Sequence, residues 1–147
     1  MVAQVSTVLA RKGAEVATIA TDATLTTAAI TLSQHDVGAL VVSEDGTSVV
    51  GILSERDIVR EIARSGANHW SRRPVGDVMS EAVTVCTPDS PLDELMALMT
   101  RQRIRHIPVV DANQRLCGIV SIGDIVKNRL DELEVQAQTL ERYVTGS

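Results

Sequence analysis

The chain contains an internal repeat, and this repeat limits the folds that it can adopt. Residues 51–59 read GILSERDIV, and residues 118–126 read GIVSIGDIV. The shift that carries residue 51 onto residue 118, here called the repeat shift, also aligns residues 16, 22, 25 and 42 with identical residues at 83, 89, 92 and 109, without a gap. Segments that repeat in this way fold as repeated supersecondary units, which bury their apolar faces on one another. The sequence therefore predicts two similar units that share an interface.

Each unit begins with a strand and a helix. Short apolar segments predict strands at residues 16–20 and 83–87. An apolar stripe at helical spacing follows each strand, with the members Leu25, Ala28, Ala29 and Leu32 in the first unit and Leu92, Leu95, Met96 and Met99 in the second. Ser90 and Pro91 predict an N-cap followed by the first helical residue, and Asp93 adds to a start like a capping box.

Two paired strands and a second helix complete each unit. The strand pairs are expected at residues 39–43 with 48–53, and at residues 107–110 with 116–120. Asp45-Gly46 and Ala112-Asn113 mark the turns between them, and each Ser-x-x-Asp opens the following helix. The order is therefore β-α-β-β-α twice, a mixed α/β (α+β) fold class. The expected divisions are residues 1–66 for the first unit with an N-terminal helix, 67–130 for the linker and second unit, and 131–147 for a C-terminal helical extension.

This pattern resembles the cystathionine-β-synthase (CBS) domain pair, also called a Bateman module. The resemblance covers about residues 8–130 and is carried by both Gly-Ile-(Leu/Val)-Ser-x-x-Asp motifs, by RHIPVVD at residues 105–111, and by VGDVM at residues 75–79. It implies two units packed sheet to sheet about a pseudo-twofold axis. It also implies two clefts between the units that bind AMP, ATP, NAD(H) or S-adenosylmethionine, in a sensor that acts on a partner protein.

The two Ser-x-x-Asp motifs allow a structural and a ligand-binding interpretation. Ser54 with Asp57, and Ser121 with Asp124, each precede an apolar helical run and fit a capping box. A carboxylate at a strand-to-helix junction can also accept hydrogen bonds from the two vicinal hydroxyls of a ribose. The free N–H groups of the helix start favour an anionic ligand at the same place. The two roles are compatible, because the serine can cap the helix while the aspartate binds ribose.

The resemblance assigns residues to each of the two clefts, combining the motif of one unit with strand segments of the other. The first cleft would contain Ser54, Arg56, Asp57, Val83, Thr84, Arg105, His106 and Ile107. The second would contain Ser121, Asp124, Val16, Ala17, Val37, Gly38 and Ala39.

The repeat predicts that the two clefts differ in charge. The repeat shift replaces Gly38-Ala39 by Arg105-His106, and Arg56 by Gly123. The first cleft would thus gather several cations, with Arg103 nearby, and guanidinium groups bind phosphate oxygens through charge-assisted hydrogen bonds. The alternative is that these arginines are solvated surface charges. In the second cleft the candidate phosphate ligands are Arg11 and Lys12.

Composition argues against several other functions. A net charge of −5 disfavours nucleic-acid or membrane-surface binding, and an aromatic content of 1% leaves little for base stacking. No apolar run approaches the roughly 20 residues that span a bilayer, and the first residues lack the features of a signal peptide, so a cytoplasmic protein is expected. Cys86 and Cys117 lie in strand-like segments without metal-ligand spacing and are expected to be buried free thiols.

The sequence does not favour catalysis. It has no Gly-x-Ser-x-Gly motif and no histidine spaced to serve either motif serine, so neither an enzyme nor a catalytic cofactor is expected. Two matched motifs fit two binding sites better than one catalytic centre. The alternative to a nucleotide sensor is a protein that binds a partner and whose nucleotide sites no longer function.

The C-terminal segment predicts a long helix with a heptad seam. Its apolar positions are spaced by 4, 3, 4, 3 and 4 residues, namely Val126, Leu130, Leu133, Ala137, Leu140 and Val144. The helix is expected to cover its own unit as far as Leu133. Beyond that residue it is expected to pack on a second copy of the chain, which predicts a homodimer.

Overall fold

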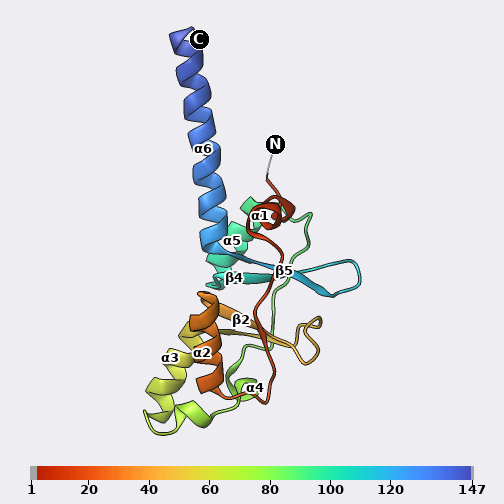
Figure 1. The fold of residues 1–147 in the computed structure, drawn as a ribbon, viewed down its shortest axis with the longest axis vertical. Coiled ribbons are helices and arrows are strands. Elements are labelled where there is room, and N and C mark those ends of the chain that lie inside the picture. The colour runs from red at the N-terminus through yellow and green to blue at the C-terminus, as the bar shows by residue number, and fades with distance from the viewer. Residues whose placement is uncertain (1–2, 147) are drawn as a thin grey trace.

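The computed structural model describes residues 3–146 and shows two small α/β units stacked along the long axis of the molecule. Residues 1, 2 and 147, at the ends of the expected divisions, lie outside the described part. The second unit lies between the first unit and a long helix that projects from one end (Figure 1). The mixed α/β class and the repeated architecture are as the sequence predicts.

The first unit contains a three-stranded sheet and two helices: β1 (Thr18–Ile19), α2 (Leu25–His35), β2 (Ala39–Val42), β3 (Gly51–Ser54) and α3 (Glu55–Ser65). The strand β1 is parallel to β2, and β2 is antiparallel to β3. The predicted helical stripe of α2 is buried at Leu25, Ala28 and Leu32. These side chains pack on the sheet and form one of two apolar cores.

The second unit repeats this order with one strand fewer: α5 (Leu92–Gln102), β4 (His106–Val110), β5 (Leu116–Ser121) and α6 (Ile122–Thr145). Its sheet has only the antiparallel pair β4–β5. Of the strand predicted at residues 83–87, a single bridge between Cys86 and Val109 remains. The second apolar core is built from α5, both strands and the start of α6.

Pro108 explains why the first strand of the second unit is missing. In the first unit the N–H of Val41 donates to the carbonyl of Ala17, which ties β1 to β2. The repeat shift places Pro108 and Thr84 at these positions. Proline has no N–H, so this hydrogen bond cannot form. The remaining bonds, from Cys86 to Pro108 and from Val110 to Cys86, support only one bridge.

The two units exchange their leading helices. Helix α1 (Val5–Lys12) precedes the first unit in the chain, yet Val5 and Val8 are buried in the core of the second unit. Helix α4 (Val75–Val78) precedes the second unit, yet Val75 is buried in the core of the first. After α1 the chain runs along the molecule to reach the first sheet (Figure 1). Grouping the N-terminal helix with the first unit therefore follows chain order but not packing.

Capping geometry is the same in both repeats at the second helices and differs at the first. Ser54 and Ser121 both form complete capping boxes, with Asp57 and Asp124, so the predicted structural role is confirmed. The predicted N-cap at Ser90 is wrong, because α5 begins one residue later, with Pro91 as N-cap. The Ser90 hydroxyl instead accepts a hydrogen bond from the N–H of Thr87 in the preceding turn.

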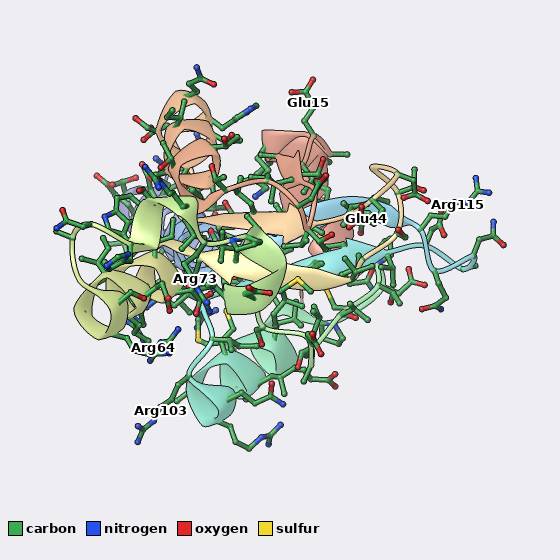
Figure 2. All side chains as sticks on the ribbon, turned by 90° about the horizontal axis from the view of Figure 1, so that it is seen from below. Glu15, Glu44, Arg64, Arg73, Arg103 and Arg115 are labelled. Carbon is green, nitrogen blue, oxygen red and sulfur yellow. The ribbon has the colours of Figure 1, made fainter. Side chains whose placement is uncertain are left out.

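A buried glutamate connects α3 to the segment before α4. Glu61 accepts hydrogen bonds from Arg64 and Ser65 on its own helix. The Nε atom of Arg73 lies 3.0 Å from Glu61 Oε1 in an ion pair, although its N–H is not aligned for a hydrogen bond. Figure 2 labels Arg64 and Arg73 on the two segments that this cluster connects. The hydrogen bond from Ser65 and the two arginines lower the pKa of Glu61, against the effect of desolvation.

Helix α6 buries a different face from the one predicted. Its buried residues are Ile125 and Asn128, and from Leu133 onward every described side chain is exposed. Val126 and Leu130 are 44% and 60% exposed, so the seam does not cover its own unit even in the first two turns. The helix of 24 residues is about 36 Å long and projects away from the body (Figure 1). The whole seam is therefore available to another surface.

Candidate functional site

A cavity of about 690 Å³ lies between the two units. Five segments surround it: the start of β2, the end of β3 with the start of α3, residues 80–84, the end of α5, and the start of β4. Its volume falls within the range of roughly 300–1,000 Å³ that is usual for small-molecule sites. Ile52, Val83 and Ile104 provide apolar wall, while charged groups gather around the α3 start and residues 103–105.

The structure brings together seven of the eight residues predicted for the first cleft. Ser54, Arg56, Asp57, Val83, Thr84, Arg105 and His106 all line this cavity. Ile107 does not, because its side chain is fully buried in the second core.

Gly38 and Ala39 line this cavity rather than the second cleft to which they were assigned. The sheet register gives the reason. Strand β2 is antiparallel to β3, which places Ala39 opposite Ser54. The N–H of Glu55 also donates to the carbonyl of Gly38. Both residues therefore lie beside the motif of their own unit.

Asp57 uses one carboxylate oxygen for capping and leaves the other free. Its Oδ2 atom accepts hydrogen bonds from the N–H of Ser54 at 2.9 Å and from the Ser54 hydroxyl at 3.1 Å. Its own N–H donates to Ser54 Oγ at 3.3 Å. Within residues 3–146, Oδ1 has no hydrogen-bond partner. The capping box thus holds the carboxylate in place without occupying both of its acceptor atoms.

Four arginines surround the cavity: Arg56, Arg60, Arg103 and Arg105. Among the described residues, none of their guanidinium groups forms an ion pair or a hydrogen bond, and all four residues are exposed. In Figure 2 the side chain of Arg103 extends outward beyond the end of α5. The acidic groups in the lining are Glu55 and Asp57, so cations exceed anions here although the chain carries a net charge of −5. This is the electrostatic environment that attracts a phosphate-bearing ligand.

His106 lies where the two units meet. Burial lowers its pKa below the ordinary value of 6.5, with Glu55 acting in the opposite direction, so the imidazole is uncharged at neutral pH. A Cβ atom placed on Gly38 would lie 3.3 Å from His106 Cε1 and 3.3 Å from Glu55 Oε1. The absence of a side chain at residue 38 therefore makes room for both groups.

In the second cleft an ion pair occupies the carboxylate of the motif. Lys12 Nζ donates to Asp124 Oδ2 at 2.6 Å, and this oxygen also accepts the N–H of Ser121 at 2.8 Å. The space here is about 100 Å³ and is lined by Val8, Arg11, Lys12, Asp124, Lys127 and Asn128.

Besides Gly38 and Ala39, four residues assigned to the second cleft do not border this space, namely Ser121, Val16, Ala17 and Val37. Ser121 instead caps α6, and the other three belong to the first unit. The carbonyl of Ala17 accepts the N–H of Val41 within the first sheet. The N–H of Val37 donates to Leu32 at the end of α2. Their backbone positions are thus set by the first unit.

Eight residues that line the large cavity were not predicted from the sequence: Ile52, Glu55, Val59, Arg60, Ser80, Ala82, Gln102 and Ile104. Arg60 carried a usable signal, because it follows Arg56 by four residues on a helix and so occupies the same face. Ile104 also carried one, because the repeat shift carries Val37, a predicted cleft residue, onto it. Gln102 at the end of α5 had no such signal.

The cysteines and possible metal ligands point to no further chemistry. Cys86 is buried and Cys117 is half-buried, and both are free thiols. Burial raises the pKa of Cys86 to about 12, which keeps it protonated and unreactive at neutral pH. Among residues 3–146 no cluster of His, Cys, Asp and Glu has the arrangement of a metal site. No helix in this part of the chain has the length and hydropathy needed to cross a bilayer.

Comparison with known proteins identifies the family. The family model described as "CBS domain" matches twice, at residues 5–64 and 75–131. The chain is 41% identical over 131 residues to the mitochondrial CBS domain-containing protein CBSX3 of Arabidopsis thaliana, covering 86% of this chain and 62% of that protein. The chain thus spans less than two thirds of that relative's length.

Solved structures agree with this match. The CBS-domain protein ATU1752 of Agrobacterium tumefaciens is 43% identical with a TM-score of 0.80, over 86% of this chain and 98% of that one. The CBS domain pair of protein MJ0100, solved with 5-methylthioadenosine and S-adenosyl-L-methionine, is 25% identical with a TM-score of 0.78, over 90% of this chain and 99% of that one. Two family matches, the repeated fold and the cavity between the units lead to one conclusion: the chain belongs to the CBS-domain family and is a pair of CBS domains.

Proposed function

We propose that the chain is a regulatory module that binds an adenine nucleotide, AMP, ATP or NAD(H), in the large cavity between its two units. One observation carries the proposal. A cavity of about 690 Å³ combines a carboxylate with a free acceptor atom, apolar wall, and four arginines that lack a partner within residues 3–146. A nucleotide offers the complementary groups, which are ribose hydroxyls, a flat base and phosphate.

The residues suggest how the ligand is held. Asp57 Oδ1 accepts from the ribose hydroxyls while Oδ2 remains in the capping box. Arg56 and Arg105 neutralise phosphate, because guanidinium groups form paired, charge-assisted hydrogen bonds with its oxygens. The base lies between aliphatic side chains such as Ile52 and Val83. The protein MJ0100, solved with two adenosine-containing ligands, supports an adenosine derivative as the ligand class here.

Regulation requires a surface that transmits the bound state, and α6 provides the candidate. Its seam is exposed, with Leu140 at 65%, and its heptad spacing is self-complementary. A second copy of the chain is therefore the proposed occupant, giving a homodimer in which the α6 helices pack together. The protein that this module regulates is a further partner, whose identity is open.

Calorimetric titration of AMP, ATP, NAD⁺ and NADH into the purified chain tests the proposal, with adenosine as the ligand that lacks phosphate. At least one nucleotide is expected to bind more tightly than adenosine and to raise the melting temperature, by an amount that grows with the logarithm of its concentration. If none of the four binds at millimolar concentration, the nucleotide function is wrong. The alternative, a partner-binding protein without functional nucleotide sites, would then remain.

A further inference from the structure

We propose that Lys12 is a built-in counter-ion that closes the second cleft, so that each chain binds one nucleotide and not two. The inference rests on the proposed function of the first cavity. It concerns the second Ser-x-x-Asp motif, whose carboxylate is already paired with a cation from the same chain, at 2.6 Å between Lys12 Nζ and Asp124 Oδ2.

The backbone hydrogen bonds of the two leading helices show which residue corresponds to Lys12 in the other cleft. The N–H of Val5 donates to Ser90, and the N–H of Val75 donates to Ala23, which the repeat shift carries onto Ser90. The N–H groups of Ser6 and Gly76 make the same matched pair of bonds, with Pro88 and Thr21. Helices α1 and α4 are therefore structural counterparts, with residue 5 matching residue 75 and residue 6 matching residue 76.

Continuing this match along both segments makes Ala82 the counterpart of Lys12, and Ala82 lines the large cavity. Helix α1 has 8 residues and carries Lys12 in its last turn. Helix α4 has only 4 residues, after which residues 79–84 follow without a helix. The longer helix brings an ammonium group to Asp124, whereas the shorter one leaves the region around Asp57 open.

The strength of the closure depends on the surroundings of the ion pair. Asp124 and Lys12 are both partly buried, with side-chain exposures of 21% and 32%. Burial alone would raise the pKa of Asp124, but hydrogen bonds from Lys12 and Ser121 lower it, so the carboxylate stays charged beside the ammonium group. Arg11, the preceding residue, forms a second ion pair with Asp131 of α6. Two adjacent cations of α1 thus hold the start of α6.

Helix α1 also cannot easily withdraw. Val5 is fully buried and Val8 nearly so, and two backbone hydrogen bonds fix the first turn to the second unit. A space of about 100 Å³ beside the ion pair is lined by residues of α1 and α6, among them Lys12 and Asp124 themselves. A nucleotide would have to displace Lys12 and reach a carboxylate that already has a cation.

One competing interpretation predicts the opposite result. Lys12, Arg11 and Lys127 gather three cations around the second cleft, so Lys12 could leave Asp124 on ligand binding and hold phosphate instead. Removing the Lys12 charge would then weaken the second site. Under our proposal the same change opens that site, so the direction of the effect decides between the two.

The test is calorimetric stoichiometry on the full-length chain and on Lys12→Met, which keeps the aliphatic length and removes the charge, using AMP and ATP. We expect one nucleotide to bind per wild-type chain and two per Lys12→Met chain. The double variant Lys12→Met/Asp124→Ala should bind one again, because it lacks the carboxylate of the second site. Lys127→Met is the matched control, because this lysine borders the same space without an ion pair among the described residues, and it should leave the stoichiometry at one. Thermal unfolding and light scattering check that each variant is folded.

Every outcome bears on the proposal. Two nucleotides per wild-type chain, or one in both wild type and Lys12→Met, overturns the closure but leaves the proposed function standing. A wild-type chain that binds none while Lys12→Met binds one supports the closure and overturns nucleotide binding in the first cavity. If neither protein binds, both ideas are wrong.

Discussion

The two Ser-x-x-Asp motifs have nearly the same local geometry and very different surroundings. In each, the serine caps a helix and the aspartate oxygen accepts the serine N–H, at 2.9 Å in the first unit and 2.8 Å in the second. The first aspartate faces a cavity of about 690 Å³, and the second faces a lysine. The motif therefore specifies a cap and a carboxylate, and the exchanged helix decides whether a ligand can reach that carboxylate.

The helices that follow the two motifs also differ, in their length. Helix α3 has 11 residues and ends at Ser65, whereas α6 has 24 residues and continues past its own unit. Val59 on α3 and Val126 on α6 occupy equivalent positions of the repeat, and both are exposed. Both repeats thus have an exposed apolar residue at this helical position. On α6 alone, further apolar residues continue it into the heptad seam.

The largest expected effect concerns this extension. Leu140→Glu places a charge in the seam, and we expect it to convert the proposed homodimer to a monomer at low micromolar concentration, as should truncation after Leu133. Val135→Glu is the matched control, because Val135 is 61% exposed on the same helix but lies off the seam. Light scattering measures the mass of each protein. A monomeric wild type would contradict the dimer, and a dimeric truncated chain would show that the end of α6 is dispensable.

The next effect distinguishes the two carboxylates. Asp57→Ala and Asp124→Ala each remove the carboxylate of one capping box and keep the N-cap serine, and Asp124→Ala also removes the ion pair with Lys12. A hydrogen bond to a charged group is worth roughly 1.5–3 kcal/mol, so Asp57→Ala should weaken nucleotide affinity about tenfold to a hundredfold. Asp124→Ala should change it less than about twofold. Equal losses in calorimetry would mean that the two clefts do not differ as proposed.

A smaller effect tests the phosphate end of the first cavity. Arg105→Ala should weaken AMP about tenfold, because one charge-assisted contact with phosphate is lost. Adenosine has no phosphate and should bind almost as well as before. Arg115→Ala, an exposed arginine on the β4–β5 hairpin that Figure 2 shows at the opposite side from Arg103, is the control. Parallel losses for AMP and adenosine would exclude Arg105 as a phosphate ligand.

The ion pair of the second cleft predicts a modest dependence of stability on pH. The folded pKa of Asp124 lies below its ordinary value of 3.8, so its contribution is present above that value and is lost as the pH falls through the folded pKa. Asp124→Asn should lower the free energy of unfolding by roughly 0.2–1 kcal/mol at pH 7. The difference from wild type should shrink below about pH 4. Urea unfolding at pH 7, 5 and 3.5 measures it, and a constant difference would contradict the pairing.

The smallest expected effect concerns the missing strand. Pro108→Val supplies an N–H at the position from which Val41 donates in the first unit. The new hydrogen bond to Thr84 would add about 0.5–1.5 kcal/mol, and the loss of proline's restraint on the unfolded chain would remove about 0.4–1 kcal/mol. Stability should therefore change little. Hydrogen exchange should show protection at residue 108, and a rapidly exchanging amide there would refute the explanation of the missing strand.

Much of this fold was predictable, because it depends on local patterns that the repeat presents twice. The helical stripes at Leu25 and Leu92, the β2–β3 and β4–β5 pairs and both capping boxes follow from spacing and residue type. The failures have non-local causes. The helix exchange was not predictable from periodicity, since an apolar stripe does not specify which core receives it.

The same contrast between local and non-local causes applies to the candidate site. Residues near the first motif were placed together correctly, because a strand-to-helix junction fixes them locally. The assignment of Gly38 and Ala39 to the second cleft was wrong, because their position depends on the register of β2 with β3 and not on the motif. The pairing of Lys12 with Asp124 joins residues 112 positions apart. The repeat shift revealed that the clefts differ in arginine content but not that Lys12 pairs with the second motif. It aligns Lys12 with Met79, whereas the two leading helices align it with Ala82.

The exchange of α1 and α4 also determines the smallest piece of this chain that can fold. Each half, cut at residues 66–69, would keep a helix made for the other core and would lack the valine that fills its own. Two copies of the first half would supply α1 twice and α4 never, so only the two different halves together can complete both cores. The linker between the units therefore turns a concentration-dependent association into an intramolecular one. It also ensures that each cavity is lined by one copy of each unit.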